Sequence, residues 1–216
     1  MVQRNTIILN EPIVAHHLSI IRDKNTDMVN CSVKVLSDAL SLRAMDNLPL
    51  MDVEIETPVA KTKAKRINSN IDIFIVPILR AGLGIAEHLF RIIPSAKVQH
   101  LGMYRDEKTL KPVWYYNKLP KTFRRPDNTI VYICDPMLAT GGSIIEAIKL
   151  YTERGVPQKN ITLINLICSQ QGIDKVYSLF PDVRIVTCAV DEKLNEKGYI
   201  VPGLGDAGDR IFNTIY

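Results

Sequence analysis

Hydrophobic positions along the chain fall into short apolar runs that alternate with stretches of helical periodicity. The apolar runs have strand length and are rich in β-branched residues; they cover residues 71–78, 97–104, 129–134, 160–168 and 183–190. Apolar residues recur at helical spacing over 81–92, 143–154 and 172–179. Strands that alternate with helices predict an α/β domain with a central, mostly parallel sheet and helices on both faces.

Two regions lie outside this alternation. Residues 5–45 carry apolar residues at helical spacing from Val29 onward, which predicts an amphipathic helix packed on the sheet or on a partner subunit. Residues 106–128 are polar and basic and contain three prolines, a composition that favours a β-arm projecting from the core. Because no repeat or linker divides the sequence, we expect a single domain over 1–216.

Composition and charge agree with one buried core. The chain has 216 residues, of which 46% are hydrophobic, and this is within the range of one α/β domain. Its net charge of +4 is modest for this length and does not by itself indicate nucleic acid. One basic cluster is expected in a solvated turn, although a role in steering a polyanionic substrate stays open. Its members are Lys61, Lys63, Lys65 and Arg66.

Neither a membrane span nor a disulfide framework is suggested. No apolar stretch approaches the roughly 18 residues that cross a bilayer, and the first residues lack a signal-peptide cleavage pattern. The cysteines are widely spaced, with no CxxC pair. We therefore expect a cytoplasmic protein without a membrane partner, in which all four cysteines are buried thiols. They are Cys31, Cys134, Cys168 and Cys188.

The strongest chemical signal is the strand–turn–helix at 130–151. The strand delivers Asp135 to its carboxyl end, and a turn with paired glycines and two hydroxyls, at Thr140 and Ser143, leads into a helix. The first N–H groups of a helix have no intrahelical partner, and the helix dipole adds partial positive charge there. This turn therefore predicts a phosphate site, and Asp135 predicts a ligand that also carries hydroxyls, such as a sugar phosphate.

Other phosphate loops do not match. The chain has no GxxxxGK[ST] motif of the nucleotide hydrolases and no GxGxxG motif of dinucleotide-binding proteins. The stretch 82–84 imitates the second motif but lacks its third glycine.

The turn 135–143, DPMLATGGS, resembles the phosphoribosyl-diphosphate (PRPP) loop of the type I phosphoribosyltransferases, in the form used by the uracil phosphoribosyltransferase branch. Many members of the wider group have a second acid where this chain has Cys134, a departure typical of the uracil branch. Three further segments match in the same order. They are the diphosphate loop at 76–84, the start of a flexible arm at 102–107, and the base-binding segment at 198–209.

The resemblance implies a type I phosphoribosyltransferase fold with a β-arm at about 105–128 and a C-terminal base-binding hood at about 198–210. It assigns catalytic roles to Asp135 on the ribose, Arg80 on the diphosphate and Arg105 on the closing arm. The bond from Leu79 to Arg80 is the candidate for a cis peptide. The residues implied to bind PRPP are Arg80, Arg105, Asp135, Pro136, Met137, Leu138, Ala139, Thr140, Gly141, Gly142, Ser143 and Asp206.

The same resemblance implies transfer of phosphoribose from PRPP to N1 of uracil. Uracil presents an acceptor, a donor and an acceptor along one edge, which backbone groups of a tight loop can match. Cytosine would place a donor against a donor, so we expect strong discrimination. The implied uracil-binding residues are Ile200, Gly205, Asp206 and Ala207.

Cofactor and partners follow from the resemblance as well. Mg²⁺ is expected, held mainly by PRPP oxygens rather than by a protein cage. A homodimer or homotetramer is expected, and GTP is a candidate effector.

Two alternatives stay open. Basic and aromatic residues interleave along the arm, as in single-stranded nucleic-acid platforms, and some RNA-binding regulators of pyrimidine operons use this scaffold. An enzyme of the same fold could also use another base, such as a purine. The interleaved residues are Lys111, Trp114, Tyr115, Tyr116, Lys118, Lys121, Arg124 and Arg125.

Overall fold

A mixed sheet forms the centre of the molecule in the computed structural model, which describes residues 5–105 and 112–214. The main path runs β1-β11-β10-β8-β4-β6-β7, and β5 and β9 pair with β4 and β10. All these pairs are parallel except β6 with β7. The bounds are β1 Thr6–Ile8, β4 Asp72–Leu79, β5 Lys97–Val98, β6 Leu101–Arg105, β7 Pro112–Asn117, β8 Thr129–Cys134, β9 Met137–Leu138, β10 Ile161–Ser169 and β11 Arg184–Asp191.

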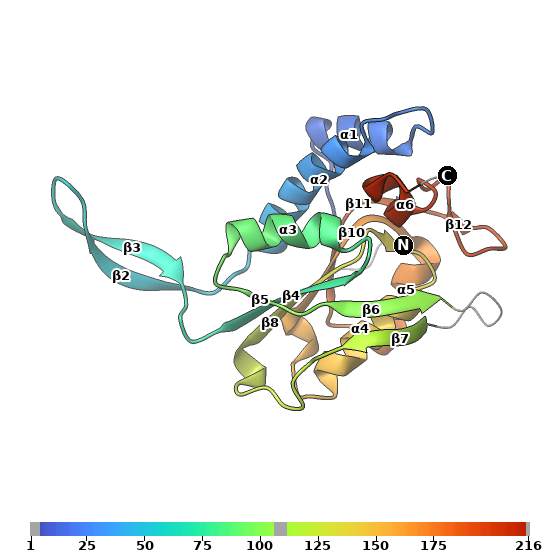
Figure 1. Cartoon of the computed structure of the whole chain (residues 1–216). Coiled ribbons are helices and arrows are strands. Elements are labelled where there is room, and N and C mark those ends of the chain that lie inside the picture. The colour runs from blue at the N-terminus through green and yellow to red at the C-terminus, as the bar shows by residue number, and fades with distance from the viewer. Residues whose placement is uncertain (1–4, 106–111, 215–216) are drawn as a thin grey trace.

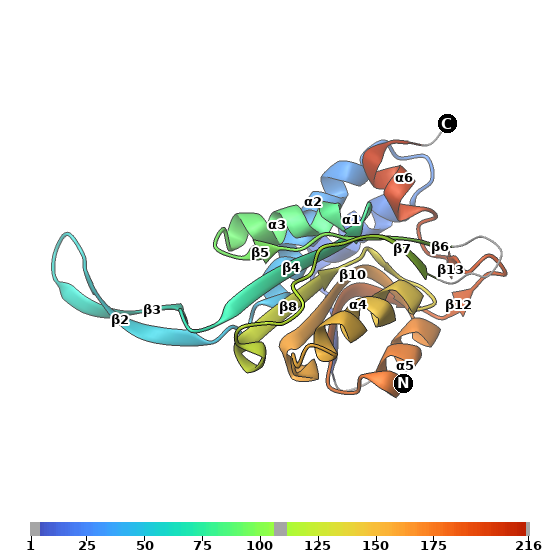
Figure 2. The ribbon, with the colours of Figure 1, turned by 60° about the horizontal axis from the view of Figure 1, so that its bottom comes forward.

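Helices cover both faces of the sheet, as predicted (Figures 1 and 2). Successive residues of β4 alternate between the two cores, so Ile75 packs on the side of α1, α2 and α3, and Val76 on the side of α4 and α5. Both residues are fully buried. The helices are α1 Pro12–Arg22, α2 Val29–Ala44, α3 Leu83–Ile92, α4 Gly142–Thr152, α5 Gln170–Leu179 and α6 Ala207–Phe212, with short 3₁₀ turns at Pro126–Asn128 and Gln158–Asn160.

The predicted elements match most closely where apolar runs are long. Strand β8 has the predicted bounds, and β4, β10 and β11 differ by a residue or two. The run expected as one strand over 97–104 is divided into β5 and β6. The amino-terminal region forms two helices and the edge strand β1, which was not predicted because three residues carry no readable periodicity.

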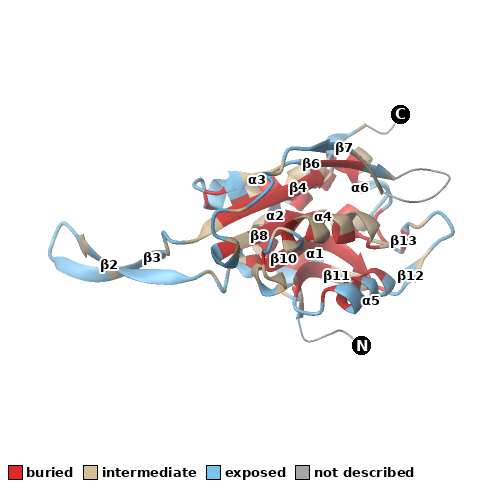
Figure 3. Ribbon diagram, turned by 90° about the horizontal axis from the view of Figure 1, so that it is seen from below, coloured by how far each residue is buried: buried red, intermediate tan, exposed pale blue. Residues whose placement is uncertain are grey.

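A β-hairpin projects far from the body and is exposed along its length (Figures 1 and 3). Its strands are β2, Leu50–Glu56, and β3, Lys61–Ile67. The solvated turn expected around Lys63 was therefore wrong, because this segment is a strand. Carboxylates on β2 face the lysines: Glu54 is paired with Lys63, and Asp52 lies 2.7 Å from the Lys65 ammonium. These cross-strand charges allow a polar sequence to form a strand.

The expected extended stretch at 113–116 is confirmed within β7, which pairs with β6 at the sheet edge. Residues 106–111, including Lys111, lie outside the described residues. Three cysteines are buried as expected, but Cys31 is exposed, because it is not among the residues by which α2 packs into the core. Over residues 5–105 and 112–214, no helix has both the length and the apolar character needed to span a membrane.

Candidate active site

Asp135 follows the last residue of β8, and its backbone N–H and carbonyl both form hydrogen bonds with residues of β10. Its N–H donates to the Ile164 carbonyl at 3.2 Å, and its carbonyl accepts from the Asn165 side-chain amide at 2.5 Å. The Asp135 carboxylate accepts from the Met137 N–H at 3.4 Å. With the main chain fixed in this way, the half-buried carboxylate lines a large cavity at the carboxyl edge of the sheet.

The turn that follows Asp135 rests on the start of α5. The Ser169 hydroxyl donates to the Ala139 carbonyl at 2.6 Å and accepts from the Gly172 N–H at 2.8 Å. A Cβ on Gly172 would lie only 2.4 Å from the Ala139 oxygen. Gly141 has a φ of 76° and caps α4, a conformation that favours glycine. The free first-turn N–H groups of α4 are thereby presented by a supported turn.

Arg80 follows β4 on a second loop beside the first. The Leu79–Arg80 peptide bond is cis, as the resemblance implied. A Cβ on Gly82 would lie 2.2 Å from the Cys134 carbonyl oxygen, so the two loops pack with no room for a side chain there. The Arg80 guanidinium is exposed and donates to the Asp209 carboxylate at 3.1 Å. Hydrogen bonds from the Thr214 hydroxyl and from Arg80 lower the pKa of Asp209.

The C-terminal segment faces these two loops. It contains β12, Lys193–Leu194, paired with β13, Ile200–Val201, followed by a cis Val201–Pro202 bond and α6. The Asp206 carboxylate caps α6 by accepting from the Asp209 N–H at 2.9 Å. Gly205 has a φ of 82°, so its place in the turn also favours glycine.

One cavity of about 830 Å³ lies between the loops and the C-terminal segment. Its walls come from chain segments more than fifty residues apart, and they bring the expected ribose acid together with the expected base-binding residues. The lining residues are Ala81, Asp135, Met137, Ala139, Glu196, Lys197, Gly198, Tyr199, Ile200, Gly205, Asp206, Ala207 and Gly208.

Other predicted site residues lie around this cavity rather than in its wall. Pro136 and Leu138 are buried, and the Pro136 carbonyl accepts from two N–H groups of β10. The stretch 140–143 leads from the cavity wall into α4. Arg105 ends β6, and its side chain lies outside the described residues.

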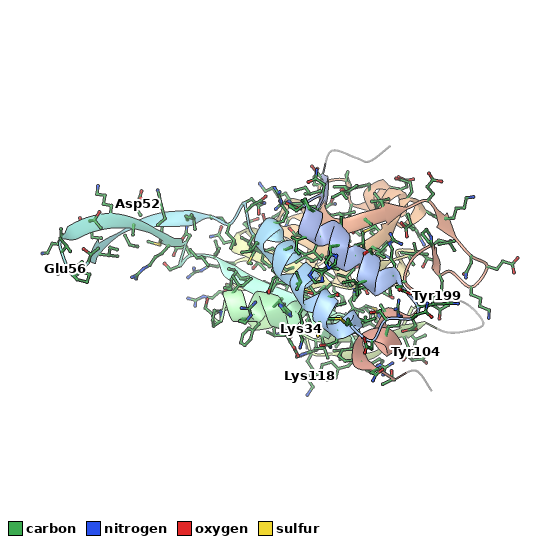
Figure 4. All side chains as sticks on the ribbon, turned by 90° about the horizontal axis from the view of Figure 1, so that it is seen from above. Lys34, Asp52, Glu56, Tyr104, Lys118 and Tyr199 are labelled. Atoms are coloured by element: carbon green, nitrogen blue, oxygen red, sulfur yellow. The ribbon has the colours of Figure 1, made fainter. Side chains whose placement is uncertain are left out.

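Sequence reasoning missed Glu196 and Lys197 as wall residues, and it included Tyr199 only as part of the base-binding segment. They sit on a turn in which the Asn195 side chain accepts from the N–H groups of Lys197 and Tyr199, at 3.0 and 2.9 Å. The Asn-x-x-Gly spacing from Asn195 to Gly198 was the readable sign of this turn. Tyr199 lies at the end of the molecule opposite the hairpin, the same end as Tyr104 (Figure 4).

The oxygen donors of the cavity suit a hard divalent cation that brings other ligands with it. Asp135 and Asp206 both line the cavity, and carboxylates are the ligands Mg²⁺ prefers. Across the part of the chain that the structure describes, no group of three or more His, Cys, Asp or Glu side chains could hold a metal ion. Two acids without a cage fit an ion carried mainly by a phosphorylated substrate.

A mostly parallel sheet with a phosphate-type turn after β8 and a C-terminal segment over its carboxyl edge is the type I phosphoribosyltransferase fold. The structure is similar to that of the AQ2163 protein from Aquifex aeolicus, with a TM-score of 0.87, 34% identity, and coverage of 98% of this chain and 100% of that one. It also shares the fold of adenine phosphoribosyl transferase from Trypanosoma brucei, with a TM-score of 0.57, 11% identity, and coverage of 95% and 90%.

Sequence comparisons narrow the class to one family. The family profile described as uracil phosphoribosyltransferase matches residues 8–214. The uracil phosphoribosyltransferase of Dictyoglomus turgidum is 50% identical over 211 residues, covering 96% of this chain and 99% of the relative. That of Limosilactobacillus fermentum is 46% identical over 209 residues, covering 96% and 97%. The chain therefore belongs to the uracil phosphoribosyltransferase family, which goes against the RNA-binding regulator alternative.

Proposed function

We propose that this chain transfers the 5-phosphoribosyl group of PRPP to N1 of uracil, which gives UMP and diphosphate. One observation carries the proposal: Asp135 lines the same cavity as Ile200 and residues 205–207. A ribosyl donor and a base acceptor must react within a few ångströms of each other, so a shared cavity is the arrangement this reaction needs.

The turn after β8 is assigned to the sugar phosphate. Backbone N–H groups of 139–143 and the hydroxyls of Thr140 and Ser143 would bind the 5′-phosphate at the amino terminus of α4. The Asp135 carboxylate would accept hydrogen bonds from the ribose hydroxyls. Pro136, Met137 and Leu138 would support this turn through their contacts with β10.

The reaction exchanges one bond at C1′ for another. The C1′–oxygen bond to diphosphate breaks and its electron pair leaves with the diphosphate. The C1′–N1 bond forms with the N1 lone pair, and the N1 proton is released. The ribose is cationic between these events, so the fixed negative charge of Asp135 favours the transition state more than the ground state.

Two arginines are assigned to the diphosphate. Arg80 offers a planar fork of donors beside the cavity and would exchange its Asp209 partner for phosphate oxygens. Arg105, at the end of β6, would close over the diphosphate and exclude water. Mg²⁺ bound to PRPP, with Asp135 and Asp206 within reach, would neutralise charge on the leaving group.

The base is assigned to Ile200, Gly205, Asp206 and Ala207. Uracil O2, N3–H and O4 would pair with backbone N–H, C=O and N–H groups of this turn. A cytosine amino group at position 4 would face an N–H and leave it unpaired, which costs about 1–3 kcal/mol. A purine would have to match the same order of backbone donors and acceptors.

Assembly into a homodimer or homotetramer and activity in the cytoplasm are part of the proposal, with GTP as a candidate effector. The hairpin supports assembly. An isolated two-stranded hairpin is marginally stable in water, and this one carries an apolar face with Met51, Val53 and Ile55 on alternate positions of β2. A second copy of the chain would cover that face.

The test is product formation from PRPP and Mg²⁺ with uracil, cytosine or adenine as the base. We expect UMP and diphosphate in equal amounts with uracil, and no nucleotide with cytosine or adenine. Diphosphate release without UMP, or AMP formation, would refute the base assignment. Salt-sensitive binding of RNA without turnover of PRPP would instead support the alternative of an RNA-binding regulator.

A further inference from the structure

A largely buried ion pair joins Arg22, at the end of α1, to Asp191, at the end of β11. Arg22 donates to both oxygens of the Asp191 carboxylate, at 2.8 and 2.7 Å. Asp191 is only 8% exposed. Burial opposes ionisation of Asp191, but the bonds from Arg22 and from a backbone N–H outweigh it and keep its pKa below the ordinary value. Fork geometry with both oxygens satisfied makes this a rigid contact.

Arg22 and Asp191 together form hydrogen bonds with both backbone groups of one residue in the C-terminal segment, Gly203. The Gly203 N–H donates to Asp191 at 2.9 Å, and the Gly203 carbonyl accepts from Arg22 at 2.9 Å. Gly203 has a φ of 55°, and a Cβ there would lie 2.2 Å from the Ile200 carbonyl oxygen. The turn is therefore folded tightly against the pair, within a few residues of cavity residues Ile200 and Gly205.

A second arginine ties the same segment to the same helix end. Arg210 donates to the Leu204 carbonyl at 2.8 Å and to the Ile21 carbonyl at 2.5 Å. Its other nitrogen donates to the Asp23 carbonyl at 2.6 Å. Carbonyls at the carboxyl end of a helix lack intrahelical partners and carry partial negative charge. The end of α1 is therefore a fixed support for residues 203 and 204.

We propose that Arg22, Asp191 and Arg210 are positioning residues that fix the backbone of 200–206 in the arrangement that selects the base. The inference rests on the proposed function, because it assigns that segment to uracil. None of the three lines the cavity, so they act through the turn. Recognition by backbone groups needs placement within about half an ångström, and a turn has little rigidity of its own.

The test is the Arg22→Gln variant, assayed with PRPP and uracil. We expect the KM for uracil to rise about tenfold or more, as is typical for loss of a charge-assisted hydrogen bond, while the KM for PRPP is unchanged. Discrimination against cytosine should weaken, because the backbone donors are no longer held in place. Arg22→Lys keeps the charge without the fork, and it should restore only part of the uracil affinity.

Arg184→Gln is the matched control. Arg184 begins the same strand, β11, at the opposite edge of the sheet, and is also largely buried. It donates to the carbonyls of Arg43 and Ala44 at the end of α2 and to the Asp46 carboxylate. Its loss should lower the melting temperature as Arg22→Gln does, without changing the KM for uracil.

A purely structural role for Arg22 would give both variants the same lower melting temperature and an unchanged KM for uracil, and that result would overturn the inference. If Arg22→Gln does not fold, Asp191→Asn and Arg22→Lys take its place. The KM for uracil of each variant is then compared with that of the unsubstituted chain. Failure of the proposed function is distinct, because it appears as absence of UMP formation by the unsubstituted chain.

Discussion

Asp135 illustrates how one side chain acquires a role from its backbone. Its N–H and carbonyl both hydrogen-bond to β10, so the backbone from which the carboxylate reaches the cavity is fixed in place. For Asp135→Asn we expect kcat to fall about 100-fold, the scale of losing one preorganised electrostatic contact, with little change in the KM for PRPP.

Initial rates of UMP formation measure this effect. Asp72→Asn is the control, since Asp72 begins β4 at the opposite edge of the sheet and pairs with Lys97. Equal activity of the Asp135 and Asp72 variants would remove the role assigned to Asp135.

Arg80 is assigned to the diphosphate, so its loss should weaken the binding of PRPP. In Arg80→Gln the fork of donors is lost, so the KM for PRPP should rise about 10- to 100-fold, the range for hydrogen bonds to charged groups. Arg91→Gln on the neighbouring α3 breaks an exposed pair with Asp38 and should leave the KM unchanged. Steady-state kinetics at saturating uracil distinguish the two, and equal KM values would contradict the assignment.

Among the elements, α5 packs closely against the turn after β8, which is assigned to the phosphate. Gly172→Ala would push a Cβ into the Ala139 carbonyl, so the turn must shift. We expect a lower melting temperature and a higher KM for PRPP. Gly84→Ala in α3 is the matched control, because its Cβ would meet only side-chain atoms at 3.4 Å or more, and alanine favours a helix by roughly 1 kcal/mol.

The melting curve and the KM for PRPP are measured for both glycine variants. A Gly172→Ala protein with unchanged KM would mean that the turn is not part of the phosphate site.

Some of the strands could be predicted from the sequence and others could not. Strand β8 was predictable to the residue because a continuous apolar run meets Asp135 and Pro136. The hairpin was not predicted, since lysines on β3 conceal a strand whose partner charges lie on β2. The alternation of Asp, Val, Glu and Ile along β2 was a period-two signal that could have identified it.

Likewise, some residues of the site could be predicted from the sequence and others could not. Asp135 and the 200–207 segment were readable because local motifs carry them. The contacts of Arg22 and Arg210 join residues 169 and 189 positions apart, and no local pattern encodes such a pair. The Arg80–Asp209 pair was likewise not visible before the fold brought its members together.

For the whole molecule, the burial of the two cores predicts the reactivity of its thiols. Burial raises the pKa values of Cys168 and Cys188 to about 12 and raises that of Cys134 as well, so these groups are protonated and shielded at pH 8. Cys31 is exposed. A disulfide reagent at pH 8 should titrate one thiol per native chain and four after denaturation.

The Cys31→Ser variant should then show no fast-reacting thiol. Rapid reaction of several thiols in the native protein would mean that the sheet is more open than described.

At the same scale, the first helix, α1, contacts the C-terminal segment beside the cavity. Helix α6 contacts α2 through the Asn30 side chain, which donates to the Ile211 carbonyl at 3.2 Å. The proposed reaction requires both substrates to meet in that one cavity. A crystal structure with UMP tests this most directly. It should show the phosphate on the N–H groups of 139–143, the ribose hydroxyls on Asp135 and the pyrimidine edge on 200–207. UMP bound elsewhere, or bound with its base directed away from 200–207, would contradict it.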